Sequence, residues 1–335
     1  MRVYRIHEFR EADFLRQEEL PDPSPGPGQA SVRVRAVSLN YRDLLVAKGL
    51  YNRNLRLPLV PLSDAAGEVV GVGPGVTRVQ PGDRVAIACM PVWVAGEPTP
   101  AGAKSSLGAA TDGVLAEQIV LSQEGLVPVP DHLTFEEAAT LPCAAVTAWH
   151  ALVTEGQVRA GDTVLVLGTG GVSIFALQFV HLSGARVIAT SSSDEKLERV
   201  LGMGASDGIN YKTTPDWDAR ARDLTGGVGV DHVVEVGGAG TLPKSLRAVR
   251  MGGRISMIGV LSGGGEVNPL PILMRNIRVQ GIFVGSREMF EAMNRAIAFH
   301  QVRPVIDRVF EFEEAAAAYR HLESGAHFGK IVIRV

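Results

Sequence analysis

The stretch Thr163-Val-Leu-Val-Leu-Gly168-Thr-Gly170-Gly171-Val-Ser173 decides the fold, and Ile-Phe-Ala-Leu-Gln-Phe-Val180 continues it. The Val and Leu run at its start is too short for a buried helix, so it predicts a strand buried on both faces. Glycines follow directly, and then a largely apolar segment of helical length. A strand, a tight glycine turn and a helix start are typical of a dinucleotide cradle, in which the helix N-terminus faces the pyrophosphate.

Each glycine of this turn has an expected role. Gly168 permits the tight turn, and Gly170 lets backbone N–H groups approach a pyrophosphate. Ser173 stands where a third Gly or Ala is usual, so we expect slightly looser packing of the helix on the strand. An ordinary βα turn would carry similar glycines. However, residues 184–190 follow the helix as a second buried strand at βαβ spacing, and this combination favours nucleotide binding.

Composition limits the possible partners. The 335 residues are enough for two domains, and a formal net charge of −3 gives no basic field that would attract nucleic acid. No apolar run reaches the length of a membrane span, and the N-terminus lacks the apolar core of a signal peptide. The two cysteines, Cys89 and Cys143, form no disulfide framework and suit a reducing cytoplasm. We therefore expect a cytoplasmic protein with no nucleic-acid or membrane partner.

The first part of the chain is predicted to be β-rich. Residues 31–38 alternate apolar and polar side chains, as a half-buried strand does, and residues 67–73 and 83–88 have the pattern of further short strands. Residues 91–112 are rich in Gly, Pro, Ala and Ser. They predict a long mobile loop near a site, or a plain surface loop.

From about Pro130 strands alternate with helices. Four strands follow the first two, so about six parallel strands are expected, as in a full doubly wound sheet; the four are residues 208–211, 231–236, 253–259 and 277–284. Near the end, residues 310–320 predict a helix and 330–335 a closing strand. The predicted fold is α/β: residues 126–287 form the dinucleotide-binding domain, and residues 1–125 and 288–335 form the β-rich domain.

The end of the second strand indicates which nucleotide binds. NAD-binding folds hold the ribose 2′-hydroxyl there with a carboxylate, but residues 188–193 contain no acid. A carboxylate about 4 Å from a 2′-phosphate would cost several kcal/mol at an effective dielectric near 20, so its absence permits NADP. Ser191, Ser192 and Lys196 offer donors to that phosphate, and NADPH is therefore the expected cofactor.

The same residues have a simpler interpretation. Ser192-x-x-Glu195 is a capping box that starts a helix, and Lys196 is then a solvated helix residue. A serine run can serve both roles, since an N-cap uses one hydroxyl. The predicted cofactor-binding residues of this region are Gly168, Thr169, Gly170, Gly171, Val172, Thr190, Ser191, Ser192, Lys196 and Tyr211.

Several short strings, in order along essentially the whole chain, carry a family resemblance. They are Asn40-Tyr-Arg-Asp-Leu-Leu, Pro61-Leu-Ser-Asp-Ala-Ala-Gly-Glu-Val, Pro81-Gly-Asp-Arg-Val, Leu141-Pro-Cys-Ala-Ala-Val-Thr-Ala-Trp, Gly168-Thr-Gly-Gly-Val, Val234-Glu-Val-Gly-Gly and Gly252-Gly-Arg-Ile. The chain resembles zinc-independent members of the medium-chain dehydrogenase/reductase superfamily, near the quinone oxidoreductases. The resemblance implies a GroES-like β-domain and a Rossmann domain, with the active site in the cleft between them.

The resemblance also implies further cofactor contacts. Thr147 stands where a threonine contacts the nicotinamide ring, although a buried helix threonine bonded to its own backbone is the simpler interpretation. Backbone at Gly259, Val260 and Leu261 would line the ribose and nicotinamide, and backbone at Phe283, Val284 and Gly285 would bind the carboxamide. Lys330 stands where a cation often reaches the cofactor phosphates, and plain surface charge is its alternative.

The resemblance implies which positions of this chain correspond to the ligands of the catalytic zinc in related enzymes. At most of these positions the ligand residue is replaced. Asn40 stands at the first cysteine position, Ser63 at the histidine position and Asp64 at the glutamate position, so only Cys143 remains. One thiolate cannot complete a zinc site, which takes three protein ligands. The loop after Cys89 lacks the four cysteines of the structural-zinc lobe. We expect no zinc and read Cys143 as a small buried apolar residue.

Loss of zinc limits the chemistry. Without a Lewis acid, alcohol oxidation loses its main driving feature, whereas a quinone or activated enone still accepts a hydride if hydrogen-bond donors meet its oxyanion. Asn40, Tyr41, Tyr51 and Ser63, with Thr147, are the predicted catalytic residues. Arg42 and Asp43 follow Asn40 and Tyr41 in the sequence, and a structural ion pair is the alternative interpretation of these two residues. The expected substrate is a small electrophilic acceptor.

Two other functions remain open at this point. A zinc-free alcohol or aldehyde dehydrogenase would use the same fold, and a non-catalytic NADPH-binding protein is a third possibility, since some relatives of quinone oxidoreductases serve as lens crystallins. In related proteins the sixth strand pairs across a two-fold axis. Residues 277–284 are a suitable apolar edge, so a homodimer or homotetramer is expected.

Overall fold

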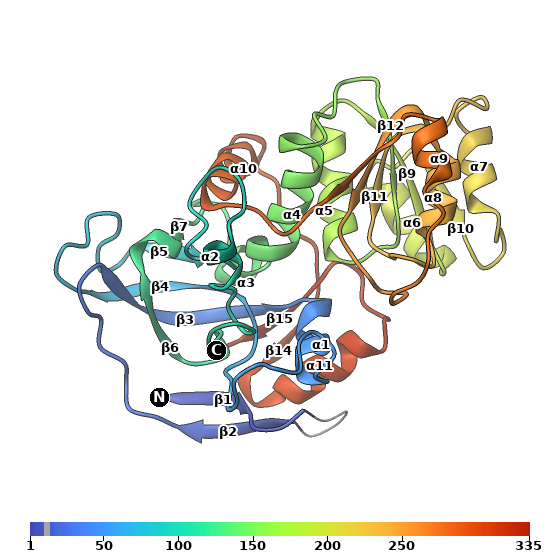
Figure 1. The fold of residues 1–335 in the computed structure, drawn as a ribbon. Coiled ribbons are helices and arrows are strands. Elements are labelled where there is room, and N and C mark those ends of the chain that lie inside the picture. The colour runs from blue at the N-terminus through green and yellow to red at the C-terminus, as the bar shows by residue number, and fades with distance from the viewer. Residues whose placement is uncertain (10–13) are drawn as a thin grey trace. The chain divides into compact units, whose positions relative to one another are not determined.

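The run of Val and Leu at Thr163–Val166 forms strand β8, the first strand of a six-stranded parallel sheet. The structure is a computed structural model that describes residues 1–9 and 14–335. It divides into two compact units, Met1–Val146 with Val284–Val335, and Thr147–Phe283. We call the first the β-rich unit and the second the parallel-sheet unit. Figure 1 labels most of their elements.

The sheet order of the parallel-sheet unit confirms the doubly wound prediction. The order is β10-β9-β8-β11-β12-β13, and every neighbouring pair is parallel. The chain therefore starts in the middle of the sheet, builds outward on one side and then on the other, which places the switch point between β8 and β11. The other strands are β9 (Arg186–Ser191), β10 (Asp207–Asn210), β11 (Val230–Glu235), β12 (Val249–Met257) and β13 (Arg278–Gly281).

Apolar strands form the core of this unit. Leu165, Ile188, Val233 and Ile255, one from each of four strands, are fully buried in a single cluster, as expected of strands covered on both faces. The helices are α5 (Gly171–Leu182), α6 (Asp194–Gly202), α7 (Trp217–Asp223), α8 (Leu242–Ala248) and α9 (Leu270–Met274), and α4 (Val146–Trp149) straddles the boundary between the units.

The third motif residue makes a hydrogen bond to the end of strand β8. Ser173 in α5 is buried, and its Oγ donates a hydrogen bond of 2.6 Å to the carbonyl of Leu167 at the end of β8. A hydroxyl in this place adds a hydrogen bond that Gly or Ala cannot make. This hydrogen bond links the helix directly to the turn, and the slightly looser packing stays a prediction.

The β-rich unit is built around the long strand β3 (Gln29–Leu39), which pairs with β15 (Lys330–Arg334), β4 (Asp64–Val72) and β6 (Gln118–Ser122). The seven-stranded sheet runs β14-β15-β3-β4-β5-β7 with β6 beside β3, and β1 pairs with β2. The remaining bounds are β1 (Arg2–Ile6), β2 (Leu15–Glu19), β5 (Arg84–Ile87), β7 (Leu126–Pro128) and β14 (Ile306–Glu311). The predicted strands at 31–38, 67–73 and 83–88 are β3, β4 and β5.

Helices complete this unit. They are α1 (Tyr41–Ala47), α2 (Pro100–Ala103), α3 (Phe135–Ala139), α10 (Arg287–His300) and α11 (Ala315–Glu323). The helix expected from residue 310 starts later, at Ala315, because Phe310 is buried in β14 opposite Ile333. A 3-10 turn over Phe312–Glu314 joins the two elements.

The boundaries of the two units differ from those read off the sequence. The chain leaves the β-rich unit at Val146 rather than at residue 125, because α3 packs on β3 and β4. It returns at Val284, and the strand β15 then confirms the predicted closing strand beside β3.

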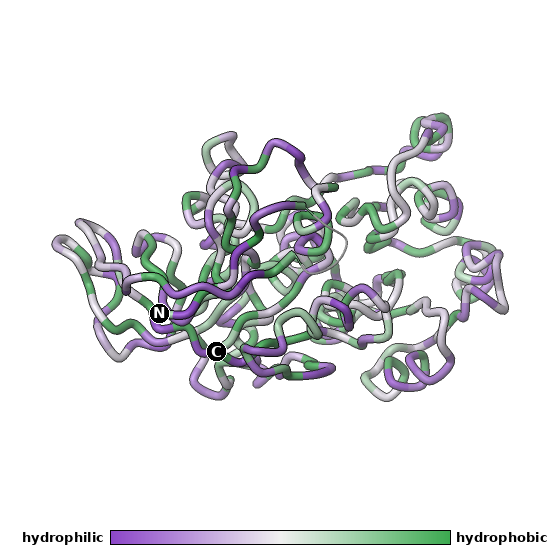
Figure 2. The backbone as a smooth tube through the Cα atoms, turned by 90° about the horizontal axis from the view of Figure 1, so that it is seen from below, coloured by the Kyte–Doolittle hydropathy of each residue, from purple (hydrophilic) through white to green (hydrophobic). Residues whose placement is uncertain are grey.

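Hydropathy alternates over a few residues along much of the chain, as expected of elements that bury one side (Figure 2). Among the described residues no helix has the length and apolar character needed to cross a membrane.

Candidate functional site

The glycine turn after β8 has the geometry of a phosphate cradle. Gly168 has φ +73°, a conformation that L side chains rarely adopt, and its N–H donates to Thr190 Oγ1 at 3.2 Å. Gly170 is the N-cap of α5, and it has no side chain that could accept from the first helical turn. The N–H groups of that turn therefore need water or a ligand anion as partners. The arrangement fits the pyrophosphate of a dinucleotide.

The end of β9 contains hydroxyl groups where a ribose carboxylate is usual. Ser191 Oγ accepts from the N–H of Ser193 at 3.2 Å, and the Ser191 carbonyl accepts from the N–H of Tyr211 at 3.0 Å. The first acid after the strand, Asp194, accepts from Asn210 Nδ2 at 2.7 Å. Its carboxylate is thus engaged within the turn.

The helix cap at this place is one residue later than the sequence predicts. Ser193, not Ser192, is the N-cap of α6, and its Oγ accepts from the N–H of Lys196 at 3.3 Å. The expected capping box at Ser192 is wrong because the strand β9 continues to Ser191 and the helix begins at Asp194. The half-buried Ser192 hydroxyl is therefore not used as the cap.

A buried carboxylate shapes the turn after β11, and sequence reasoning missed it. Glu235 Oε1 accepts from the N–H groups of Gly237 at 2.7 Å and Gly238 at 3.1 Å, and from Thr241 Oγ1 at 2.6 Å. The Gly259 N–H donates to the Glu235 carbonyl at 3.2 Å, which ties the β12 end to this turn. The Val-Glu-Val-Gly-Gly string was the available signal.

The predicted nicotinamide residues divide between the two units. Gly259 must be glycine, since a Cβ there would lie 2.1 Å from the Val236 carbonyl oxygen. Val260 and Leu261 follow it and are largely exposed. Thr147 is buried in α4. Phe283 ends the parallel-sheet unit, whereas Val284 and Gly285 begin the return of the chain through the β-rich unit.

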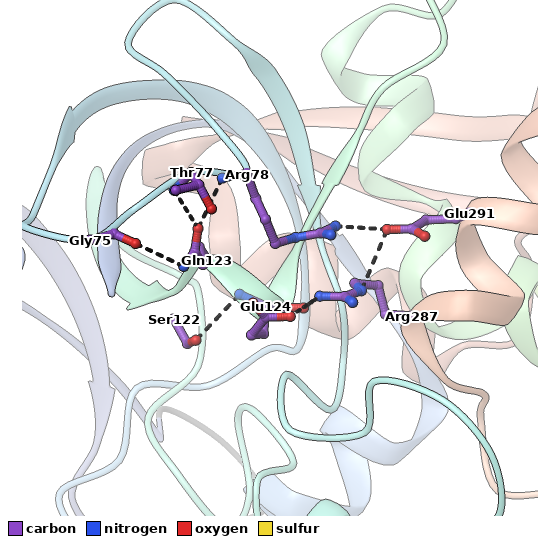
Figure 3. Close-up of polar contacts among 8 residues, drawn as sticks. All are labelled: Gly75, Thr77, Arg78, Ser122, Gln123, Glu124, Arg287 and Glu291. Carbon is purple, nitrogen blue, oxygen red and sulfur yellow. Dashed lines mark hydrogen bonds and ion pairs between the residues drawn. The ribbon is translucent and has the colours of Figure 1, made fainter. Parts of the chain in front are cut away.

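A network of charged residues anchors the chain directly after Gly285 (Figure 3). Arg287, at the start of α10, donates to the carbonyl of Glu124 at 3.2 Å and pairs with its carboxylate. Glu291, one turn further on, pairs with Arg287 at 3.4 Å and with Arg78 at 2.7 Å. Gln123 Oε1 accepts from the N–H groups of Thr77 and Arg78. The network fixes the start of α10 to the β6–β7 turn.

In the β-rich unit, Asn40 and Lys330 form a direct contact that the sequence did not predict. Lys330 is 3% exposed, and its Nζ donates to the carbonyl of Leu39 and to Asn40 Oδ1, both at 2.6 Å. Lys330 is therefore neither surface charge nor unpaired within its own unit. Asn40 is the N-cap of α1, and a capping box links it to Asp43, the third residue of the helix.

Asp43 anchors the same turn without an ion pair to Arg42. Its Oδ2 accepts from the Asn40 N–H at 2.7 Å. Burial raises the pKa of Asp43 to about 6, although Arg42 and the Asn40 N–H act in the opposite direction. The Arg42 guanidinium is directed elsewhere, to Cys89 Sγ at 3.3 Å, the Leu107 carbonyl at 3.1 Å and Ser106 Oγ at 2.8 Å.

Two cysteines and one aspartate form a cluster, and two of these residues, Asp64 and Cys143, stand at zinc-ligand positions that the family resemblance implies. One ligand atom each of Asp64, Cys89 and Cys143 lies within 4.8 Å of the others. The sequence prediction counted Cys143 alone and read it as buried, whereas it is partly exposed and Cys89 lies beside it. Spacing gave no signal, because the two cysteines are 54 positions apart in the sequence.

The neighbours of this cluster oppose a metal ion. Asp64 Oδ1 accepts from Ser63 Oγ at 2.6 Å, and Asp64 Oδ2 accepts from the Cys143 N–H at 3.1 Å. The Arg42 guanidinium already lies against Cys89 Sγ. A zinc ion would share that sulfur with a fixed positive charge, so the three residues fit the metal poorly.

The two tyrosines of the predicted set are partly exposed. Tyr41 begins α1 and is 42% exposed; Tyr51 is 38% exposed and lies under the Arg42 guanidinium, with 5.4 Å from Arg42 Cζ to the ring centroid. Within the β-rich unit the structure therefore gathers Tyr51 with Arg42, Asn40 with Lys330, and Ser63 with Asp64.

The comparisons with known proteins agree with this fold. Residues 26–131 match the model of the alcohol dehydrogenase GroES-like domain, and residues 171–298 match that of the zinc-binding dehydrogenases. A rat quinone oxidoreductase is 29% identical, covering 99% of this chain and 97% of its own. A crystal structure of a putative alcohol dehydrogenase from Sinorhizobium meliloti 1021 is 44% identical, with a TM-score of 0.93 and coverage of 100% and 99%.

A further sequence likeness extends over both units. A Schizosaccharomyces pombe protein named zinc-type alcohol dehydrogenase-like protein C1773.06c is 46% identical over 99% of each chain. Such identity over the full length, with the GroES-like and Rossmann units in the expected order, leaves one conclusion: the chain belongs to the medium-chain dehydrogenase/reductase superfamily and is an oxidoreductase.

Proposed function

We propose that the protein transfers a hydride from NADPH to a quinone or an α,β-unsaturated carbonyl without zinc. When bound, the reduced nicotinamide supplies the hydride. The protein's part is to bind both molecules, to orient them and to stabilise the oxygen that gains negative charge. The single observation that carries the proposal is the side chain of Asn40, which Lys330 holds in one orientation.

The orientation of Asn40 follows from the chemistry of its partner. An ammonium group has only donors, so the amide atom 2.6 Å from Lys330 Nζ must be the oxygen. Nδ2 is then directed away from Lys330. It is buried and has no hydrogen-bond partner among the residues that the structure describes.

An unpaired buried N–H group costs about 1–3 kcal/mol, which a ligand oxygen at Nδ2 would recover. An oxygen that becomes an enolate or phenolate during reduction gains most from such a donor. The ammonium also polarises the amide and makes its N–H groups better donors. Asn40 is therefore the donor that we assign to the acceptor's oxygen.

The proposal omits zinc because the ligand chemistry disfavours it. Ser63 replaces the histidine ligand and donates to Asp64, and Asn40 is bonded to a cation. Arg42 supplies a positive charge at Cys89. Acceptors that are already electrophilic do not need a Lewis acid, whereas unactivated alcohols do.

The preference for NADPH rests on the end of β9. The carboxylate of Asp194 is engaged by Asn210, and the Ser192 hydroxyl is not the helix cap. A 2′-phosphate would thus meet hydroxyl groups and Lys196 rather than a carboxylate. We keep the cytoplasm as the proposed location, since both cysteines are free thiols.

We further propose a homodimer, or a tetramer made of such dimers, through the edge strand β13. This strand is the last of its sheet, and α9 directly before it exposes Leu270, Leu273 and Met274 by more than half of their surface. An apolar patch beside an unpaired strand edge is a typical pairing surface.

Consumption of NADPH tests the function directly. Purified protein is assayed with quinones, enones, aldehydes and alcohols, each with and without a chelator, and its zinc content is measured. We expect turnover of quinones or enones that the chelator leaves unchanged. Stoichiometric zinc required for turnover, alcohol-dependent reduction of NADP as the main activity, or tight NADPH binding with no turnover would each overturn the proposal.

A further inference from the structure

The thiols of Cys89 and Cys143 form a pair that the proposed hydride transfer does not use. Their sulfur atoms lie within 4.8 Å of each other. Cys89 follows strand β5, and Cys143 lies in the π-helical turn Leu141–Ala145. Both pack in one small apolar cluster with Met90 and Trp93. A disulfide needs the sulfurs about 2 Å apart, so at least one of the two side chains must rotate before the bond can form.

The surroundings make the two sulfurs unequal. Arg42 Nη1 donates to Cys89 Sγ at 3.3 Å, and the Leu107 carbonyl and Ser106 Oγ hold the rest of the guanidinium. The hydrogen bond from Cys143 and the charge of Arg42 lower the pKa of Cys89, although burial opposes them.

The second thiol has the opposite tendency. The hydrogen bond to Cys89, burial and the nearby carboxylate of Asp64 raise the pKa of Cys143 well above its usual value. Cys143 is also the more exposed of the two. The sulfur of Cys89 is thus suited to attack an oxidant, and the neighbouring thiol of Cys143 keeps its proton.

We propose that Cys89 and Cys143 are a peroxide-sensitive dithiol that closes to a disulfide within the chain, with Arg42 activating Cys89. The Cys89 thiolate attacks one oxygen of a hydroperoxide, the O–O bond breaks, and the alkoxide or hydroxide leaves with a proton from solvent. The sulfur of Cys143 then attacks the sulfenic acid at Cys89, and water leaves with the Cys143 proton. Two thiols lose two electrons, and the hydroperoxide gains them.

The position of Arg42 explains why this site differs from a metal site. A metal ion would hold both thiolates apart and protect them from oxidation. A guanidinium is a hydrogen-bond donor that favours the thiolate but leaves its sulfur lone pairs reactive. The inference concerns thiol chemistry alone and does not require the proposed hydride transfer.

Mass spectrometry of the whole chain tests the inference. The reduced protein is exposed to hydrogen peroxide, unfolded and alkylated, and its mass and peptides are analysed. Because the chain has 2 cysteines, every thiol that is lost belongs to this pair. We expect both thiols to disappear with the loss of two hydrogen atoms, a cross-linked peptide that joins Cys89 to Cys143, and full recovery with dithiothreitol.

Variants identify the role of each residue. In Cys143→Ser we expect one added oxygen on Cys89, and in Cys89→Ser we expect Cys143 to resist the same dose. Arg42→Gln should slow oxidation about tenfold, whereas Arg42→Lys should keep much of the rate. Arg53→Gln, an exposed arginine of the same unit, is the matched control and should oxidise like the parent. Thermal unfolding of each variant verifies that it is folded.

The inference is wrong if both thiols survive a dose that oxidises free cysteine, or if disulfides form only between chains. Stoichiometric zinc that copurifies and blocks alkylation of both thiols would equally overturn it. Since no readout uses NADPH or an acceptor, these results are distinguishable from a failure of the proposed function.

Discussion

At the scale of single residues, two roles are proposed for Lys330. It either orients Asn40, which it contacts, or binds the cofactor phosphates, as the family resemblance implies. If Lys330 orients Asn40, Lys330→Met should lower kcat and leave the affinity for NADPH near that of the parent, because the lost contact is with the acceptor's donor. Asn40→Ala should lower kcat by about 100-fold, as for the loss of an oxyanion donor. Steady-state kinetics and NADPH titration by fluorescence measure both.

Lys330→Arg is the matched control, because it keeps a buried cation that only donates. It should retain more kcat than Lys330→Met. Weaker NADPH binding with unchanged kcat in Lys330→Met would instead support the phosphate contact that the family resemblance implies.

The buried carboxyl of Asp43 gives stability a defined pH dependence. Its pKa is raised by burial from 3.8 to about 6, while Arg42 and Lys330 oppose the shift and Asp64 adds to it. The folded chain therefore binds more protons than the unfolded chain between these values. The stability from this group is full below about pH 4 and is lost as the pH rises through about 6.

Asp43→Asn removes this titration. The free energy of unfolding of the variant, minus that of the parent, should rise as the pH rises from about 4 to about 7. The rise should reach roughly 3 kcal/mol for a pKa shift of about two units. Thermal unfolding of both proteins across this range measures the difference, in which other titrating groups cancel. A difference that does not change with pH would contradict the raised pKa.

Some residue roles were predictable and others were not. The glycine of the β8 turn could be assigned from sequence because one residue type meets a positive φ at low cost. The approach of Cys89 to Cys143 could not, because it depends on how β5 meets the turn Leu141–Ala145. Arg42 likewise has neighbours in sequence that suggest an ion pair, but its partners come from residues 89, 106 and 107.

At the scale of elements, two neighbouring serines at the start of α6 have different predicted roles: Ser193 caps the helix, and Ser192 binds the cofactor. Ser193→Ala should destabilise the cofactor-free protein by about 1 kcal/mol, because Ser193 Oγ caps the helix. Ser192→Ala should leave that stability nearly unchanged and weaken NADPH binding, by about 1.5–3 kcal/mol if the hydroxyl meets the 2′-phosphate.

Thermal unfolding without cofactor and NADPH titration distinguish these two serines. A loss of stability in Ser192→Ala that equals the loss in Ser193→Ala would contradict the cap position. NADH affinity is the internal control, since it has no phosphate at this place and should change little in either variant.

The error of one residue at this cap has a physical cause. The sequence Ser191-Ser192-Ser193 offers three similar caps, and local pattern alone does not choose among them. The choice follows from the pairing of β9 with β10, which holds Ser191 opposite Asn210 and keeps it in the strand. Tertiary pairing therefore sets the helix start.

At the scale of the whole molecule, the doubly wound parallel sheet could be predicted from the sequence because strands alternate with helices from about Pro130. The boundary of the units could not. Residues 126–146 include a strand and a helix that also suit an alternating α/β pattern, yet β7 pairs with β5, and α3 packs on β3 and β4. Packing rather than pattern assigns them to the β-rich unit.

The assembly of whole chains gives the last prediction. If two copies pair through the edge of β13, a charge on the neighbouring helix α9 should separate them, because Leu273 is 77% exposed in the single chain and would be covered in the dimer. The Leu273→Glu variant should be more monomeric than the dimeric parent. Phe299→Glu is the matched control: Phe299 is 82% exposed on α10, which belongs to the β-rich unit, whereas β13 belongs to the parallel-sheet unit. Sedimentation velocity over a range of concentrations measures both, and a monomeric parent, or dissociation by Phe299→Glu alone, would rule out the β13 edge as the interface.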